Sequence, residues 1–278
     1  MKFLVTTDYS ENSKAGVKFA LQAYKQIGIE IHFFHCIEVL KPTSWSKQKY
    51  KSYLKYEFQK HSEQLNEFLK PLLKEIKISD LKFNLTIASG LEVDQLAIRE
   101  AKKQKVDFIC MSTRGAGGLT KLFGTHASQM INDSTVPVIV VPTNYKPIAL
   151  KKIWYSTDLE DFKWEYKKLQ STLKTFPVNI EIHHYNYLAK DKGTKSRFEK
   201  MTSSMAGTKT IAKLHELKLD FPLVEYMEKD IKKDKPSLVV LFTKKNRNWF
   251  SRLFLGSRSE EMSFASHTPL LVFRKRKK

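Results

Sequence analysis

The chain has few of the residues that mark disulfide-bonded, metal-clustering or membrane-spanning proteins. Its 278 residues include two cysteines, Cys36 and Cys110, and each lies inside an apolar run. Such a pair supplies neither a disulfide framework nor a metal cluster, so we expect two buried, unreactive thiols. No apolar run reaches the roughly 20 residues that span a bilayer. The opening apolar run turns polar at Thr6, too early for a signal peptide. We therefore expect a soluble cytoplasmic protein with no transmembrane segment.

Acidic residues are also scarce. The chain has 29 Asp and Glu against 49 Lys and Arg, which gives a formal net charge of +20. This charge raises nucleic acid or another polyanion as a partner. Most lysines are spread along amphipathic helical patterns, however, and only residues 274–278 form a concentrated basic run. No base-reading or base-stacking motif accompanies the charge, so we expect no sequence-specific nucleic-acid binding.

The sequence contains an internal repeat. Residues 2–8 and 152–158 are both β-rich runs that end in Thr-Asp, and 122–125 matches 254–257. Each half then ends in a Pro-led apolar run. Matched landmarks in the same order indicate a duplication. We predict one domain at 1–145 and a second at 150–278, because prolines break regular structure between 142 and 149.

Each half alternates strand and helix patterns. In the first half we predict strands at 3–6, 29–37, 82–88, 106–111 and 136–141, and helices at 11–27, 45–76, 93–105 and 125–132. Ser10 is the predicted N-cap of the first helix, and the 45–76 helix is predicted to bury one apolar face. In the second half we predict strands near 151–156, 179–185, 211–218, 237–242 and 269–273, and a helix within 188–210.

These patterns predict an α/β protein made of two doubly wound, Rossmann-like, five-stranded parallel-sheet domains in tandem. The last strand of each half is apolar and would otherwise be an exposed edge. We expect the two last strands to pair within the chain and to make a pseudo-two-fold dimer. Whether chains associate further into a homo-oligomer stays open.

Ligands of such sheets bind beyond the carboxyl ends of the strands. The residues at these positions in the first half are Thr7 and Asp8 after the first strand, Ser112, Arg114, Gly115 and Gly118 after the fourth, and Gly124, Thr125 and His126 at the start of a helix. Glycines and a helix N-terminus offer backbone N–H groups to an anion. Arg114 can bind phosphate oxygens, and Asp8 can bind ribose hydroxyls or help to hold a divalent cation. The alternative is that the glycines only form a flexible connection.

These residues resemble the universal stress protein family, whose ATP-binding members carry Gly-x2-Gly-x9-Gly-(Ser/Thr) after strand four and an Asp after strand one. The resemblance covers both halves and implies that each domain is adenine nucleotide alpha hydrolase-like. It implies that Asp8 lies near the ribose and that the backbone near Cys36 and Ile37 contacts adenine. It also implies that Gly115 and the Gly124-Thr125 pair bind phosphates.

Two departures from the family motif separate the halves. In the first half Ser112 replaces a motif glycine, and eight residues rather than nine lie between Gly115 and Gly124. In the second half Thr243 and Asn246 replace the first two glycines. We therefore predict an ATP site, with or without Mg²⁺, in the first domain and a degenerate site in the second.

No nucleophile–base set and no Walker-type P-loop is readable in the sequence. His35 fits a core histidine with satisfied hydrogen bonds, and we predict no catalytic or metal-binding residues. The predicted function is a cytoplasmic nucleotide-binding protein of stress response or signalling, not an enzyme, whose protein partners are unidentified. The alternative is a scaffold or regulatory protein that binds no nucleotide and acts through protein partners or a basic, polyanion-binding surface.

Overall fold

The computed structural model describes residues 1–37, 42–113, 125–187, 193–205, 210–218, 223–243 and 267–275. The first half contains strands β1 (Lys2–Thr6), β2 (Glu30–Ile37), β3 (Phe83–Ser89), β4 (Phe108–Ser112) and β5 (Val138–Val141), and helices α1 (Lys14–Ile27), α2 (Lys47–Ile76), α3 (Val93–Lys103) and α4 (Thr125–Asp133). The second half contains β6 (Lys152–Ser156), β7 (Asn179–Tyr187), β8 (Ile211–Leu217), β9 (Leu238–Thr243) and β10 (Leu270–Arg274), and α5 (Phe162–Leu173), α6 (Thr194–Ser203) and α7 (Leu223–Asp234). Each predicted strand has its counterpart, and α6 lies within the predicted 188–210 segment.

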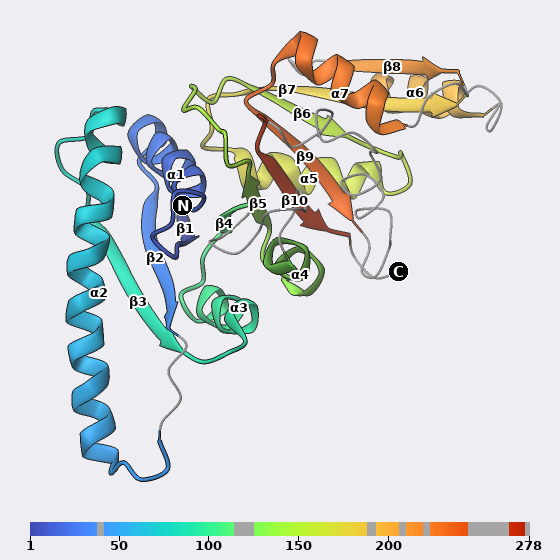
Figure 1. Ribbon diagram of the computed structural model, residues 1–278. Coiled ribbons are helices and arrows are strands. Elements are labelled where there is room, and N and C mark those ends of the chain that lie inside the picture. The colour runs from blue at the N-terminus through green and yellow to red at the C-terminus, as the bar shows by residue number, and fades with distance from the viewer. Residues whose placement is uncertain are drawn as a thin grey trace.

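The ten strands of the described residues form one sheet in the order β3-β2-β1-β4-β5-β10-β9-β6-β7-β8 (Figure 1). Strands within each half are parallel, and the halves meet where β5 pairs antiparallel with β10, with Ile139 opposite Leu271. The strand order of the second half is therefore the mirror of the first. This confirms the predicted tandem α/β fold and its pseudo-two-fold pairing within the chain. The domain limits at 145 and 150 stay a prediction.

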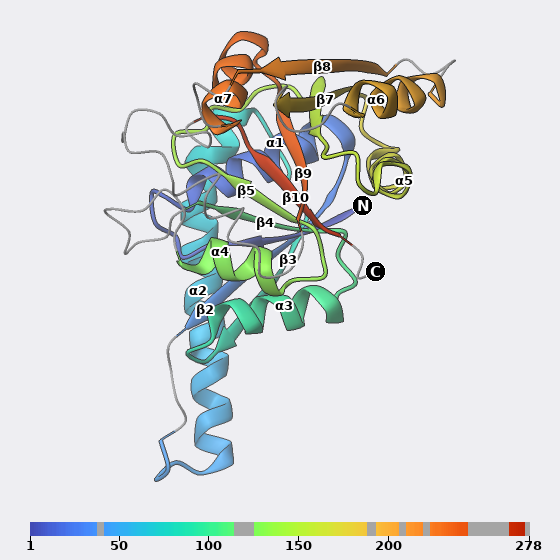
Figure 2. The same cartoon turned by 90° about the vertical axis from the view of Figure 1, so that its right-hand side faces the viewer.

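Helices cover both faces of the sheet (Figure 2). One buried core packs α1, α2, α5 and α6 on one face, and its members include Phe19, Leu65, Leu169 and Phe198. The second core packs α3, α4 and α7 on the other face, and its members include Ile98, Met130 and Met227. Because apolar side chains line both faces, the central strands are buried along their whole length, as parallel strands of this class are.

The predicted first N-cap is wrong. Helix α1 begins at Lys14 with Ser13 as its N-cap residue. Ser10 instead lies in a turn, where its hydroxyl donates to Asp8 Oδ1 at 2.6 Å and accepts the N–H of Ser13 at 3.2 Å. The side chain that the sequence pattern assigns to capping thus organises the turn that carries Asp8.

Helix α2 buries apolar side chains only in its second half. Leu65, Leu69, Leu72 and Ile76 are buried, whereas Phe58 is 46% exposed. Figure 1 shows why, because the first half of α2 extends well past the sheet. The predicted continuous apolar face is therefore wrong for the first half of this helix.

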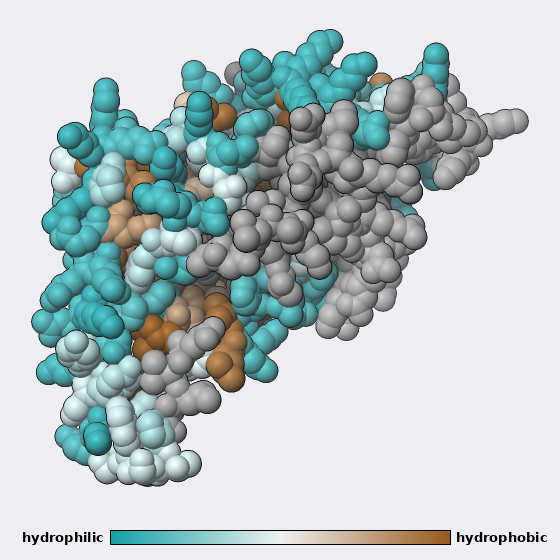
Figure 3. Space-filling view, viewed as in Figure 1, coloured by the Kyte–Doolittle hydropathy of each residue, from teal (hydrophilic) through white to brown (hydrophobic). Residues whose placement is uncertain are grey.

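Neither of the two thiols forms a disulfide, and they differ in environment. Cys110 is fully buried, and burial raises its pKa well above the ordinary thiol value. Cys36 is half-buried, with Sγ 3.4 Å from the Gly90 carbonyl oxygen, so the prediction of a buried thiol is confirmed for Cys110 alone. Among the described residues, no helix is long and apolar enough to cross a membrane. The described surface on the face in Figure 3 is mostly hydrophilic, with small apolar patches.

Candidate functional site

The carboxyl ends of β1, β2 and β4 carry four of the predicted site residues: Thr7, Asp8, Ile37 and Ser112. These ends lie at one edge of the sheet because β2, β1 and β4 are adjacent and parallel. Arg114, Gly115, Gly118 and Gly124 lie outside the described residues. Thr125 and His126 begin α4.

Thr7 shapes the turn after β1. It is buried, and its Oγ1 accepts the N–H of Tyr9 at 3.1 Å and lies 3.0 Å from Ser13 Oγ. Tyr9 adopts a left-handed backbone with φ of 62°. Asp8, between them, is exposed, and its Oδ1 also accepts the N–H of Ser10 at 3.0 Å. The turn therefore presents the Asp8 carboxylate at the rim of the sheet.

Ser112 joins β4 to α1. Its Oγ accepts the N–H of Gly16 at 2.9 Å. The contact is close because Gly16 has no side chain: a Cβ there would lie 3.0 Å from the backbone of both Met111 and Ser112. The serine that replaces a motif glycine thus holds the first turn of α1 against the sheet.

Ile37 and His126 have partners of their own. Ile37 is buried at the end of β2, and its carbonyl accepts the N–H of Gly90 at 3.1 Å. His126 Nδ1 lies 3.0 Å from both carboxylate oxygens of Asp94 in the first turn of α3. Burial raises the pKa of Asp94, and the His126 contact opposes that rise. The His126 ring is therefore oriented by Asp94 at the N-terminus of α4.

The rings of Tyr9, His35 and His61 pack beside this turn, a contact that the sequence patterns did not predict. Tyr9 stacks on His35 with centroids 4.4 Å apart, and His35 lies 4.5 Å from the ring of His61 in α2. Tyr9 also donates to the His61 carbonyl at 3.3 Å, and burial raises the Tyr9 pKa well above its ordinary value. His35 Nδ1 donates to the Thr7 carbonyl at 2.8 Å, which confirms it as a satisfied core histidine.

The second half repeats the turn. Thr157 Oγ1 accepts the N–H of Leu159 at 3.0 Å, Leu159 has φ of 65°, and His184 Nδ1 donates to the Thr157 carbonyl at 2.8 Å. Asp158 therefore holds the place of Asp8. The repeated Thr-Asp landmark in the sequence corresponds to a repeated backbone geometry.

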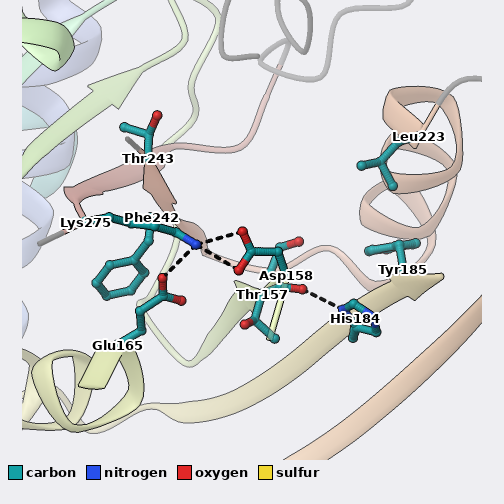
Figure 4. A pocket seen from close by; sticks show the side chains of 10 residues that line it. Thr157, Asp158, Glu165, His184, Tyr185, Leu223, Phe242, Thr243 and Lys275 are labelled. Atoms are coloured by element: carbon teal, nitrogen blue, oxygen red, sulfur yellow. Dashed lines mark hydrogen bonds and ion pairs between the residues drawn. The ribbon is translucent and has the colours of Figure 1, made fainter. Parts of the chain in front are cut away.

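A lysine binds the carboxylate of this second turn (Figure 4). Lys275 Nζ lies 2.8 and 2.7 Å from the two oxygens of Asp158 and 3.0 Å from Glu165 Oε1. The Lys275 and Glu165 side chains are only 4% and 1% exposed. Tyr155 donates to the other Glu165 oxygen at 2.5 Å. Burial lowers the pKa of Lys275, but the two carboxylates outweigh it and hold that pKa above the ordinary lysine value.

Asp158, Glu165 and Lys275 line a small pocket of about 140 Å³ together with Phe242, Thr243, Tyr185 and Leu223. Within the described residues the pocket is thus built around an ion pair rather than around an open carboxylate. Sequence reasoning missed Lys275, because it belongs to the basic run at 274–278 and reads as solvated charge.

Comparisons with known proteins agree with this architecture. The sequence model of the universal stress protein family matches residues 1–142. The chain belongs to the universal stress protein family. Over 145 residues it is 28% identical to a universal stress protein of Methanocaldococcus jannaschii, an alignment that covers 50% of this chain and 81% of the relative.

The fold likeness extends over both halves. A crystal structure of a universal stress protein from Archaeoglobus fulgidus matches with a TM-score of 0.65 at 20% identity, covering 99% of this chain and 96% of that one. A functionally unknown protein from Pseudomonas aeruginosa matches with a TM-score of 0.63 at 13% identity, covering 98% and 92%. The second half of this universal stress protein therefore shares the fold of the first.

The sheet register corrects one comparison between the halves of this universal stress protein. Val5 pairs with Cys110 and Tyr155 pairs with Val240, so Phe242, rather than Thr243, occupies the place of Ser112. Thr243 corresponds to Thr113. A bulky phenyl ring thus replaces the small hydroxyl that holds α1 in the first half.

Proposed function

We propose that the first half of this universal stress protein binds an adenine nucleotide, ATP with or without Mg²⁺, and that the protein acts in stress response or signalling in the cytoplasm. The observation that carries the proposal is the difference between the two repeated turns. Asp8 and Asp158 are both exposed, at the ends of β1 and β6, but the carboxylate of Asp158 is bound by the buried Lys275. Val141 and Phe273 occupy matching places, so Thr143 holds the place of Lys275 in the first half.

The proposed roles follow from position. Asp8 would accept hydrogen bonds from ribose hydroxyls or help to hold the cation, and the backbone near Ile37 would contact adenine. Thr125 and His126 would lie near the phosphates, since the N-terminus of α4 offers backbone N–H groups and a positive dipole. The phosphate-binding roles of Arg114, Gly115, Gly118 and Gly124 remain part of the proposal.

Thr7 and Ser112 would act indirectly. Both side chains are buried and bonded within the turn and to α1, so we assign them to shaping the site. No dedicated catalysis is part of the proposal, and ATP turnover is expected to stay below about 1 per second, the low end of typical enzyme rates.

The test is isothermal titration of the full chain with ATP, with and without Mg²⁺. We expect one site per chain, an affinity at least about tenfold weaker in Asp8→Asn, equivalent to about 1.4 kcal/mol, and an unchanged affinity in Asp158→Asn. The Asp158 variant is a matched control because it makes the same chemical change in the repeated turn. No affinity below millimolar for any adenine nucleotide would end the proposal.

A second candidate is a non-nucleotide function through a basic surface. The first half of α2 favours it, because this segment projects from the sheet and exposes Tyr56 and Phe58 at 63% and 46% (Figure 1). Its exposed lysines are Lys47, Lys49, Lys51, Lys55 and Lys60. Binding of a polyanion should fall steeply with salt because counterions are released, whereas a protein partner held by the aromatic residues should depend on salt less.

A further inference from the structure

A buried histidine in the second half presents a ring nitrogen to a pair of carboxylates. His183 on β7 is 0% exposed and stacks on Trp154 with ring centroids 3.7 Å apart. Its Nε2 has no hydrogen-bond partner among the described residues and lies 3.6 Å from Glu181 Oε2. A buried polar atom without a hydrogen-bond partner lowers the stability of a folded protein, and a ligand bound to this nitrogen would remove that cost.

The neighbouring groups fix which tautomer His183 adopts. His215 Nδ1 lies 3.1 Å from Asp230 Oδ2, and a carboxylate can only accept, so His215 carries its proton on Nδ1. The Nε2 of a neutral His215 must then accept the Nδ1–H of His183, 2.9 Å away. The free Nε2 of His183 therefore carries a lone pair and points toward Glu181.

Two carboxylates complete a set of three ligand atoms. Glu181 shares the β7 face with His183, two residues apart, and Asp234 comes from the end of α7. One atom from each of Glu181, His183 and Asp234 lies within 4.8 Å of the others. Lys213 Nζ now bridges the carboxylates, at 2.8 Å from Glu181 and 3.1 Å from Asp234. The Lys213 side chain is 39% exposed, so it can swing out to solvent.

We propose that Glu181, His183 and Asp234 bind a divalent transition-metal ion such as zinc, which displaces the Lys213 ammonium. Ligands at roughly 2.0–2.1 Å in a tetrahedral zinc site lie about 3.4 Å apart, close to the 3.6 Å between Glu181 and His183. One imidazole with two carboxylates favours such an ion over Mg²⁺ or Ca²⁺, which prefer oxygen alone. The ion would tie β7 to α7.

The Asp230–His215 pair provides the hydrogen-bond acceptor that a metal-binding histidine usually has on its other ring nitrogen. A ligating imidazole usually donates its other N–H to an acceptor, which fixes the ring and raises its basicity. Here that acceptor is His215, itself held by Asp230, and Tyr185 donates to the same carboxylate at 3.1 Å. His215 and Asp230 are therefore positioning residues in this proposal.

The first half has an apolar residue at the place of His183 and provides an internal comparison. The N–H of Thr157 donates to the His183 carbonyl as that of Thr7 donates to Phe34, so Phe34 stands where His183 stands. Phe34 is buried in the apolar core. A substitution of His183 by phenylalanine thus installs a residue that the same fold already accommodates.

The experiment uses the full chain, stripped of metal with a chelator and titrated with ZnCl₂ by calorimetry and against a chromophoric chelator. We expect one site per chain whose affinity falls at least about 100-fold in His183→Phe and Glu181→Gln, and about 10–100-fold in Asp230→Asn. Lys213→Met should bind zinc more tightly, because a competing cation is gone. His267→Gln, an exposed histidine of the same half, should match the wild type.

Lys213→Met distinguishes a metal site from an ion-pair network that only stabilises the fold. If the carboxylates serve only such a network, the Lys213→Met variant should bind zinc no more tightly than the wild type. Glu181→Gln preserves the side-chain shape if His183→Phe folds poorly. Wild-type chain with no zinc affinity tighter than millimolar would overturn the proposal. So would a site that keeps its affinity in folded His183→Phe or Glu181→Gln protein.

Discussion

Replacing Lys275 with methionine should destabilise the second half strongly. The substitution keeps the length of the side chain but removes the ammonium that binds Glu165 and Asp158. Glu165 would then remain 1% exposed with Tyr155 as its remaining described partner. Breaking a buried ion pair from one side costs about 3–5 kcal/mol, because a charge is left uncompensated.

Almost all of this expected loss of stability comes from Glu165. Asp158 is 47% exposed, so water solvates its carboxylate and replaces most of the electrostatic stabilisation by Lys275. Burial already raises the pKa of Glu165 above its ordinary value, and without Lys275 that pKa rises further. The folded variant then binds a proton more readily than the unfolded chain, so its stability increases as pH falls. We expect a loss of about 3 kcal/mol at pH 7 and a smaller loss near pH 5.

Urea unfolding followed by tryptophan fluorescence measures this loss. Glu165→Gln in the Lys275→Met background should recover part of the stability, because the buried charge is gone. Lys174→Met, which removes an exposed lysine, should stay within about 0.5 kcal/mol of the wild type. A Lys275→Met loss under about 1 kcal/mol would refute the reasoning, and so would a double variant with Glu165→Gln that recovers none of the loss.

Two further predictions concern stability. Glu228 is 4% exposed, neither of its carboxylate oxygens has a hydrogen-bond partner among the described residues, and burial raises its pKa to about 7. Because the folded state holds this proton more tightly than the unfolded chain, the stability of the wild type should fall as pH rises from the ordinary glutamate pKa toward 7. The Glu228→Gln variant should therefore be more stable than the wild type by about 1–3 kcal/mol at pH 8, and by little at pH 4.5. Equal effects at both pH values in urea unfolding would contradict this. Gly16→Ala should cost about 1–3 kcal/mol, since the new Cβ meets the backbone of β4 at 3.0 Å and this outweighs the better helix propensity of alanine. A melting temperature equal to that of the wild type would show that α1 can shift without cost.

The sequence was sufficient for the fold because its signals are local and repeated. Apolar runs, turn residues and the duplicated Thr-Asp landmark predict every strand, and the apolar last strands predict the pairing of β5 with β10. One error arose because a side chain had two possible partners: Ser10 has the pattern of an N-cap, but its hydroxyl bonds Asp8. Another arose because Phe58 continues the apolar stripe of a helix that extends past the sheet.

The candidate site was predictable only in part. Thr7, Asp8, Ile37 and Ser112 could be placed because strand ends in a parallel sheet converge. The contacts of Tyr9 with His61 and of Lys275 with Asp158 join residues 52 and 117 positions apart. Neither hydrophobic periodicity nor motif spacing predicts contacts between residues so far apart in the sequence. The same holds for His183 and Lys213, which adjacent strands bring together.

The antiparallel join of β5 and β10 also determines where the two repeated turns can act. Since all strands of the second half run opposite to those of the first, the carboxyl ends of β1 and β6 lie at opposite edges of the continuous sheet. A single small ligand therefore cannot touch both Asp8 and Asp158. The central strands, which both halves share, offer a route of communication between an occupied first turn and the Lys275 ion pair, as a change in the backbone of the sheet.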